Sequence, residues 1–247
     1  MSPDGEGITR VGMWSGPRNI STAMMRSWEN RPDTVVVDEP FYAAYLHRTG
    51  LDHPGREETL ASQPVDPSVI VRQLRALPDS GATVAYAKHM SHHMLPTDDV
   101  SWTLDFHNVL LLRDPGEVVA SYTRSRQSCE PADIGVPQQV RLWQEWQAAG
   151  TEVPVIDAAD FLRDPESYLR WLCAWLGIDF APQMLRWPSG PRDTDGVWGG
   201  HWYQAVRAST GFGRYAPREV RLEGHHAWVA ESCRPLYEML REHRLLL

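Results

Sequence analysis

The sequence predicts a single α/β domain in which a central parallel sheet is flanked by helices. Short apolar runs rich in Val, Ile and Leu alternate with longer stretches whose apolar residues recur at helical spacing. This alternation is typical of parallel strands joined by crossover helices that cover both faces of the sheet. A chain of 247 residues suffices for one domain with a sizeable core, and no internal repeat marks a boundary, so residues 1–247 are expected to form one domain.

Five apolar runs are expected to be the strands of this sheet. They contain few charged residues, which is typical of strands that are buried on both faces. The runs are residues 11–14, 34–37, 83–88, 107–112 and 153–156.

The segments between the strands are expected to be helical. Helical spacing or helix-forming composition is found in residues 23–28, 41–46, 69–77, 115–126, 138–149, 165–176 and 225–243. Two segments rich in Gly and Pro, 47–66 and 187–217, are expected to be lids over the functional site. For 187–217, an alternative is an irregular subdomain that uses its aromatic residues as core.

Composition argues against several classes of protein. The net charge of −8 argues against binding to nucleic acid or to anionic membranes. No apolar stretch approaches the length of a membrane span, and the first nine residues do not have the character of a signal peptide. Three widely separated cysteines fit a reducing, cytoplasmic location and no zinc cluster. The oligomeric state is not indicated by the sequence.

A polar loop, residues 15–22, joins the first strand to the helix that follows. Such a loop presents backbone N–H groups and a helix N-terminus to an anion. Arg18 adds a fixed positive charge. Short polar side chains that can bind phosphate-like oxygens follow at Asn19, Ser21 and Thr22. The alternative is an ordinary helix start that happens to be rich in Asn and Ser.

The loop lacks two features of a nucleotide-kinase loop. With Gly16 as the first glycine, Thr22 occupies the lysine position and Ala23 stands where a hydroxyl should hold magnesium. The loop is therefore expected to bind its anion without a metal. One alternative is an ATP-dependent kinase or ATPase in which Asp38 and Glu39, after the second strand, hold magnesium.

A second motif starts where the fourth strand ends. Asp114 is a good N-cap, Pro115 suits the first helical position, and Glu117 completes a capping box. Arg113 therefore lies beside a helix start, and Ser121 follows two turns along the same helix face. An Arg and a Ser placed in this way can bind a phosphate. The alternative is a well-capped structural helix with an exposed Arg.

The two motifs together resemble the sulfotransferases that use 3′-phosphoadenosine 5′-phosphosulfate (PAPS). Their phosphosulfate loop has the form Pro-Lys-Ser-Gly-Thr-Thr, which residues 17–22 follow with Arg18 in the basic position. The resemblance implies that the phosphosulfate is bound by Arg18, Asn19, Ile20, Ser21 and Thr22. Arg113 and Ser121 match the Arg, and the Ser eight residues later, that bind the nucleotide 3′-phosphate in this family.

This resemblance implies the P-loop NTPase-like architecture of the sulfotransferases. It implies PAPS as the sulfuryl donor, adenosine 3′,5′-bisphosphate (PAP) as the product, no metal, and a small organic acceptor with a hydroxyl or amine. Two positions depart from the family pattern. Ala23 stands where many cytosolic members have an adenine-stacking Trp, and Ala158 stands where they often have a Tyr. Adenine recognition is therefore expected to differ in detail or to be weaker.

The candidate catalytic residues follow the second and third strands. Lys88 is the only lysine among 24 basic residues, and a compact ammonium can stabilise charge on a leaving oxygen. The family has a Lys and a His after the third strand, which suggests His89 as the base, although the register also allows His92 or His93. Glu39 is the rival base. A third class of function is a nucleotide-binding protein without catalysis.

Overall fold

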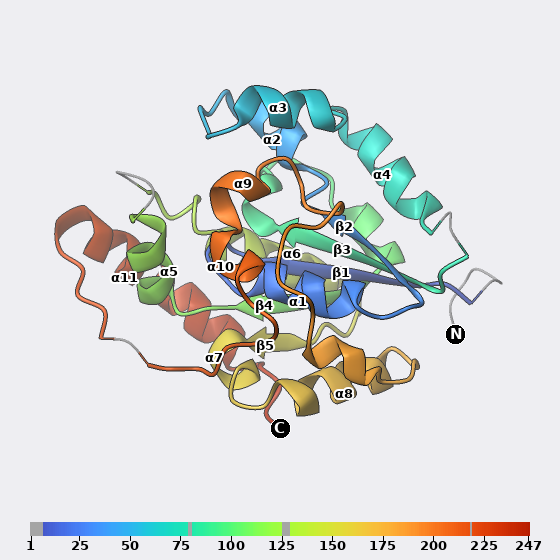
Figure 1. Cartoon of the computed structure of the whole chain (residues 1–247). Helices are drawn as coiled ribbons and strands as arrows, with labels where there is room; N and C mark the ends of the chain where they lie inside the picture. The colour runs from blue at the N-terminus through green and yellow to red at the C-terminus, as the bar shows by residue number, and fades with distance from the viewer. Residues whose placement is uncertain (1–6, 79–80, 125–128, 218) are drawn as a thin grey trace.

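The computed structural model describes residues 7–78, 81–124, 129–217 and 219–247, and its centre is a five-stranded parallel sheet (Figure 1). The strands are β1 (Thr9–Ser15), β2 (Thr34–Asp38), β3 (Val84–Met90), β4 (His107–Leu112) and β5 (Val155–Asp157). Their order across the sheet is β2-β3-β1-β4-β5, and neighbouring strands pair in parallel. The predicted α/β fold with a parallel sheet is confirmed, and each predicted run overlaps one of these strands.

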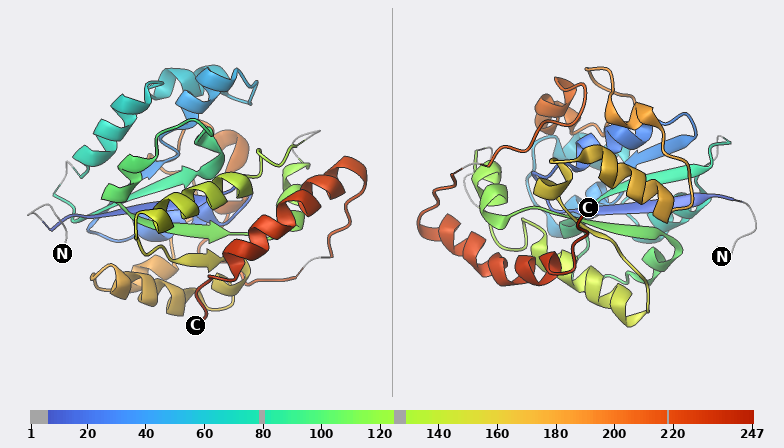
Figure 2. Two further views of the ribbon diagram at one scale, coloured as in Figure 1. Left: turned by 180° about the vertical axis from the view of Figure 1, so that it is seen from behind. Right: turned by 90° about the horizontal axis from the view of Figure 1, so that it is seen from below.

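Helices cover both faces of the sheet. Those that pack closely on it are α1 (Ser21–Glu29), α6 (Val136–Ala148), α8 (Pro165–Trp175) and α11 (Gly224–Arg241). The helices α1 and α8 lie on one face, whereas α6 and α11 lie on the other (Figures 1 and 2). Because successive strand residues point to opposite faces, Met13 joins the core beneath α1, whereas Trp14 joins the core beneath α6.

The remaining helices are short and lie around these two layers. They are α2 (Tyr42–Thr49), α3 (Arg56–Ser62), α4 (Pro67–Ala76), α5 (Pro115–Tyr122), α7 (Ala158–Phe161), α9 (Gly199–Trp202) and α10 (Gln204–Arg207). Single 3₁₀ turns span Ser91–His93, Ser101–Asp105 and Pro182–Leu185. The helix expected over 115–126 ends at Tyr122, and residues 125 and 126 of that expectation lie outside the described residues.

The two segments expected to be lids contain more structure than their composition suggested. Segment 47–66 includes the helix α3, and segment 187–217 includes α9 and α10. In the second segment the aromatic side chains of Trp187, Trp198 and Tyr203 are buried. These side chains act as core, as the alternative interpretation of this segment expected, and the role of both segments as lids stays a prediction.

The parallel arrangement brings the functional candidates to one edge of the sheet. The loop after β1, the acidic residues after β2, the end of β3 and Arg113 after β4 all lie at the carboxyl ends of the strands. This is the edge where open α/β sheets bind their ligands. In Figure 1 the orange chain with α9 and α10 passes in front of this region and of α1.

Candidate active site

The loop after β1 is fixed by contacts to two other segments. Asn19 donates a hydrogen bond from its side chain to the Leu111 carbonyl at 3.0 Å and accepts one from the Ile20 N–H at 2.8 Å. A Cβ on Gly16 would lie 2.3 Å from the carbonyl oxygen of Ile134, so only glycine fits there. The loop is therefore held between β4 and the turn before α6.

The two sequence motifs meet in space at Arg18. The Arg18 Nε donates to the Ser121 Oγ at 3.0 Å, and Arg113 donates a hydrogen bond to the Arg18 carbonyl. Arg18 also has a left-handed backbone, with φ of 55°, which a non-glycine residue rarely adopts. The loop conformation thus brings its basic residue next to the α5 motif, although 103 positions separate Arg18 from Ser121.

Three arginines, Arg18, Arg113 and Arg124, lie near one another at this junction. Burial and the neighbouring cations Arg113 and Arg124 lower the pKa of Arg18 below its ordinary value. Arg113 is paired with Glu117 at 3.0 Å, and Glu117 also accepts a hydrogen bond from the Tyr215 hydroxyl at 3.2 Å. A cavity of about 620 Å³ opens beside Arg113 and Ser121 and is partly lined by residues 219–223. This junction can bind an anion, because a bound negative charge would relieve the repulsion among the cations.

Lys88 lies in a buried ionic cluster rather than at an open surface. Its side chain is 1% exposed, and its Nζ lies 2.8 Å from the Asp38 Oδ1 and 2.6 Å from the Glu39 Oε1. The hydroxyl of Tyr203 is also 2.6 Å from the Nζ. Strand pairing causes this meeting, because Asp38 on β2 is the partner of Lys88 on β3. Glu39 follows with φ of 41° and donates its N–H to the Lys88 carbonyl at 2.9 Å.

The cluster changes the acidity of its members. Burial, reinforced by Asp38, raises the pKa of Glu39 above its ordinary value, although Lys88 opposes this change. Burial by itself would lower the pKa of Lys88, but the carboxylates of Asp38 and Glu39 hold it above its ordinary value. Lys88 is therefore a cation, and Glu39 is a carboxyl group that accepts a proton more readily than an exposed glutamate.

The histidines occupy two different environments. His89 follows Lys88 within β3 and points to the opposite face, where its ring stacks on Trp14 at 4.0 Å between centroids. Burial lowers the pKa of His89 to about 3, and its Nε2 meets no hydrogen-bond partner among the described residues. His93, in the turn after β3, has its Nε2 4.0 Å from the Glu39 Oε2. The neighbouring His92 is also buried, and its ring lies 4.5 Å from that of His93.

Burial also sets the acidity of His93. Together with the neighbouring His92, His53 and Lys88, it lowers the pKa of His93 well below its ordinary value. Of the histidines proposed as the base, the structure thus brings His93 near Glu39 and Lys88, whereas the His89 side chain lies on the opposite face of the sheet from Lys88.

Sequence reasoning missed the C-terminal half of the site. The Tyr203 hydroxyl contacts Lys88, Asp38 and Glu39 from the end of α9. Asp195, whose side chain is 3% exposed, pairs with Arg26 on α1 and with Arg207. Tyr203 is one of many aromatic residues and lies 115 positions from Lys88, so no pattern in the sequence links the two residues.

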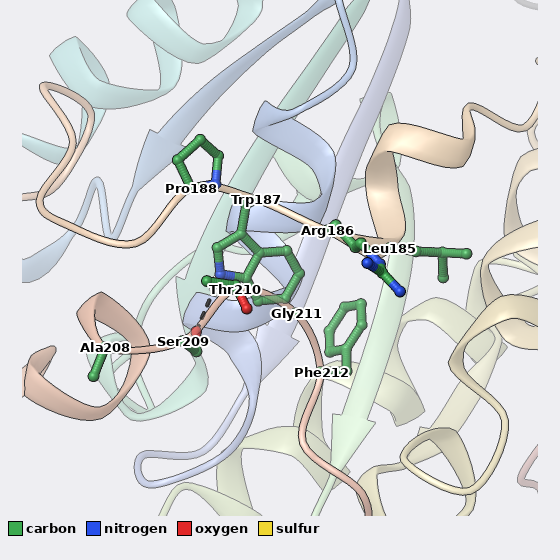
Figure 3. Close-up of a pocket in the computed structure, with 9 residues that line it drawn as sticks. All are labelled: Leu185, Arg186, Trp187, Pro188, Ala208, Ser209, Thr210, Gly211 and Phe212. Carbon is green, nitrogen blue, oxygen red and sulfur yellow. Dashed lines mark hydrogen bonds between the residues drawn. The ribbon is translucent and has the colours of Figure 1, made fainter.

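A second cavity, of about 850 Å³, lies where residues 185–188 run beside residues 208–212 (Figure 3). Arg186 and Gly211 form an isolated antiparallel bridge there, and Trp187 meets Phe212 edge-on at 5.0 Å between ring centroids. The lining residues include none of the predicted site residues.

Among the described residues, no group of three or more His, Cys, Asp or Glu side chains is arranged to hold a metal ion. In the same part of the chain, no helix combines the length and the apolar character needed to cross a membrane.

Comparison with known proteins gives a family match over almost the whole chain. Residues 9–242 match a family model described as "Sulfotransferase domain". Two curated proteins of Arabidopsis thaliana are similar. Branched-chain-amino-acid aminotransferase-like protein 1 is 37% identical over 238 residues, and protein 2 of that name is 34% identical over 233 residues. Each comparison covers 93% of this chain but 41% of the relative, so the chain spans less than half the length of these curated relatives.

Two solved structures that share the fold are sulfotransferases. The sulfotransferase domain from the curacin biosynthetic pathway is 15% identical and has a TM-score of 0.56, with 92% of this chain and 98% of that chain covered. The sulfotransferase from Alicyclobacillus acidocaldarius is 15% identical, with a TM-score of 0.52 and coverage of 96% and 97%. At this identity the likeness shows the fold, and it confirms the predicted sulfotransferase architecture.

Proposed function

The chain belongs to the sulfotransferase domain family, and we propose that it transfers a sulfuryl group from PAPS to a hydroxyl or amine of a small organic acceptor. The observation that carries this proposal is the junction of the two motifs. Arg18 bonds to Ser121, and Arg113 bonds to the backbone of Arg18. Two phosphate-binding elements that meet in this way suit a nucleotide with phosphates at two separate positions.

The donor would be held by the loop and by α5. The N–H groups at the start of α1, with the side chains of Arg18, Asn19, Ser21 and Thr22, suit the phosphosulfate, and Ile20 contributes its backbone. Arg113 and Ser121 suit the 3′-phosphate. The lowered pKa of Arg18, caused by burial and by neighbouring cations, supports an anion site here. When bound, the donor supplies the sulfuryl group, and the loop needs no metal to hold it.

Of the candidate bases, Glu39 is best supported. Its carboxylate lies 2.6 Å from the Lys88 Nζ, and its raised pKa, caused mainly by burial, suits a group that must take a proton from the acceptor. Lys88 would stabilise negative charge on the oxygen that leaves the sulfur. His93 lies close enough to Glu39 to influence it. His89 is separated from both groups by the sheet.

The test of the donor proposal is calorimetry with PAP and with AMP, both in excess EDTA. PAP should bind at least about 100-fold more tightly, because two separate sites each take one phosphate. Arg113→Ala should remove about 2–5 kcal/mol of this preference, the range for breaking a buried charge pair, and leave AMP binding nearly unchanged. Arg170→Ala, which removes an exposed Arg from α8, is the matched control. Equal affinities for the two nucleotides would contradict the proposal.

A further inference from the structure

The hydroxyl of Tyr203 lies where a substrate hydroxyl would be expected to bind. It is 2.6 Å from the Lys88 Nζ, 3.1 Å from the Glu39 Oε1, and 2.8 Å from the nearer oxygen of Asp38. A phenol has one hydrogen to donate and lone pairs to accept. Tyr203 therefore accepts from Lys88 and from the Trp198 Nε1, at 3.0 Å, and gives its hydrogen to a carboxylate.

We propose that Tyr203 occupies the place of the acceptor hydroxyl, so that the acceptor is a phenol, and that segment 195–207 must withdraw before the acceptor can bind. We call this segment the latch. The inference rests on the proposed function, because it takes Glu39 as the base and Lys88 as the group that stabilises the leaving oxygen. It adds the class of acceptor and a conformational step.

The surroundings of the Tyr203 ring support an aromatic acceptor. The ring packs in a buried cluster with Tyr42, Tyr45, Leu46 and Trp198. An aryl group that replaces the ring would meet the same faces and edges. A hydroxyl also suits this position better than an aliphatic amine. A protonated amine has no lone pair to accept from Lys88 and would repel it.

At its beginning the latch is held to the rest of the chain by polar contacts. Asp195 pairs with Arg26, whose side chain is 1% exposed, and with Arg207 within the latch. The Gly196 N–H donates to the Asp38 Oδ2 at 3.0 Å. Because Lys88 is 1% exposed while Tyr203 is in place, an acceptor can reach it only after the latch moves. The Lys88 side chain therefore reports whether the latch is open.

The transfer itself is balanced with a phenol as acceptor. The phenolic oxygen forms a bond to sulfur, and the bond from sulfur to the donor's phosphate oxygen breaks. The proton of the phenol passes to Glu39 and then to solvent, and the products are an aryl sulfate and PAP. Lys88 compensates the charge that develops on the leaving oxygen.

The movement of the latch can be measured without any turnover, because Lys88 is the only lysine in the chain. Trinitrobenzenesulfonate arylates amines, and peptide mass analysis separates Lys88 from the terminal amino group. Tyr203→Ala should accelerate arylation of Lys88 by about 10-fold or more, because the closed state loses its main contact. Tyr203→Phe, which keeps the ring, is the second variant in case Tyr203→Ala folds poorly, and it should react faster than wild type.

The matched control is Tyr237→Phe. Tyr237 is also buried, and its hydroxyl also donates to a carboxylate, that of Asp157 at 2.6 Å, but it lies on α11 outside the site. This variant should react at the wild-type rate. If Lys88 reacts as fast in wild type as in both Tyr203 variants, the latch does not cover it and the inference is wrong.

The class of acceptor is tested by filling the space left in Tyr203→Ala. The compound 4-methylphenol has the shape of a tyrosine side chain and should slow Lys88 arylation back toward the wild-type rate, with saturation. Toluene lacks the hydroxyl and 4-methylanisole lacks its hydrogen, so neither should protect more than weakly. Equal protection by toluene would show an apolar slot without hydroxyl recognition and would overturn the phenol assignment.

Turnover with PAPS separates this inference from the proposed function. Tyr203→Phe should lower the KM for 4-methylphenol by about 10-fold with little change in kcat, because a competing internal ligand is lost. A fall in kcat at constant KM would make Tyr203 a positioning residue and contradict the inference. Sulfation of Tyr203 itself would make it the acceptor and also overturn the inference. If no variant sulfates any compound while the arylation results hold, the proposed function fails and the latch stands.

Discussion

At the scale of single residues, Lys88 shows why one lysine is kept in a chain that otherwise uses arginine. Its compact ammonium lies between two carboxylates and a phenol, within 2.6–2.8 Å of each. The larger, planar guanidinium of arginine cannot occupy the same point. The geometry therefore explains a feature that the sequence alone leaves open to chance.

Replacement of Lys88 should affect turnover more than donor binding. Lys88→Ala should lower kcat by about 10²–10³-fold, the usual effect of losing one donor that stabilises the transition state, and calorimetric PAP binding should stay within about 3-fold. It should also reduce the free energy of unfolding by about 3–5 kcal/mol, because two buried carboxylates lose their partner. Lys88→Arg should restore little activity. A fully active Lys88→Arg variant would contradict the assigned role.

Protonation of Glu39 should cause the fall of kcat/KM on the acid side of the pH–rate profile, its acid limb. Since burial and Asp38 raise its pKa, the carboxylate is lost at a higher pH than in an exposed glutamate, and kcat/KM should fall as the pH drops through that raised pKa. Glu39→Gln should lower the rate and remove the limb. His93→Gln should retain this acid limb. If the acid limb persisted in Glu39→Gln, a residue other than Glu39 would be the base.

At the scale of elements, the loop after β1 depends on a close backbone contact. Gly16→Ala would place a methyl group 2.3 Å from the Ile134 carbonyl oxygen, so either the loop or the turn before α6 must move. We expect a loss of about 1–3 kcal/mol in the free energy of unfolding and weaker PAP binding. Gly200→Ala is the control, because its new methyl group would meet no atom within 4 Å. Unchanged PAP affinity in Gly16→Ala would show that the loop tolerates the shift.

Elements were predictable where the signal is local. The fourth strand, residues 107–112, was predicted with its observed bounds, and the N-cap at Asp114 fixed the start of α5. The third strand was expected to end at Lys88 but continues to Met90. That difference matters, because the residue that follows Lys88 within a strand must point its side chain to the opposite face of the sheet. His89 thus faces the core beneath α6, which strand alternation would have revealed had the strand end been known.

Contacts between distant segments could not be predicted in this way. The family resemblance assigned Arg18 and Ser121 to one nucleotide, but their direct hydrogen bond was not predicted, since periodicity and capping describe a few neighbouring residues at a time. The contact of Tyr203 with Lys88 and that of Asp195 with Arg26 join the C-terminal segment to the sheet edge and α1. They depend on how the chain returns across the molecule, which no local pattern encodes.

At the scale of the whole molecule, the buried histidines link stability to pH. His89 lies in the core between the sheet and α6, where it packs near Trp14 and Trp102. Its pKa is lowered by burial to about 3, whereas in the unfolded chain it has the ordinary value of about 6.5. Between these values the unfolded chain binds more protons than the folded one. Stability is therefore complete above about pH 6.5 and falls as the pH drops toward 3.

The contribution of His89 to this loss can be isolated by replacing it. For one such group the free energy of unfolding falls by at most about 1.4 kcal/mol per pH unit, or roughly 2 kcal/mol between pH 6.5 and 5. His89→Leu should flatten the dependence by that amount in urea unfolding at pH 5, 6, 7 and 8. The slope is the readout, because a packing defect shifts all four values equally. His47→Leu, on an exposed position of α2, should keep the wild-type slope. A His89→Leu slope equal to wild type would mean that His89 takes up a proton inside the folded core.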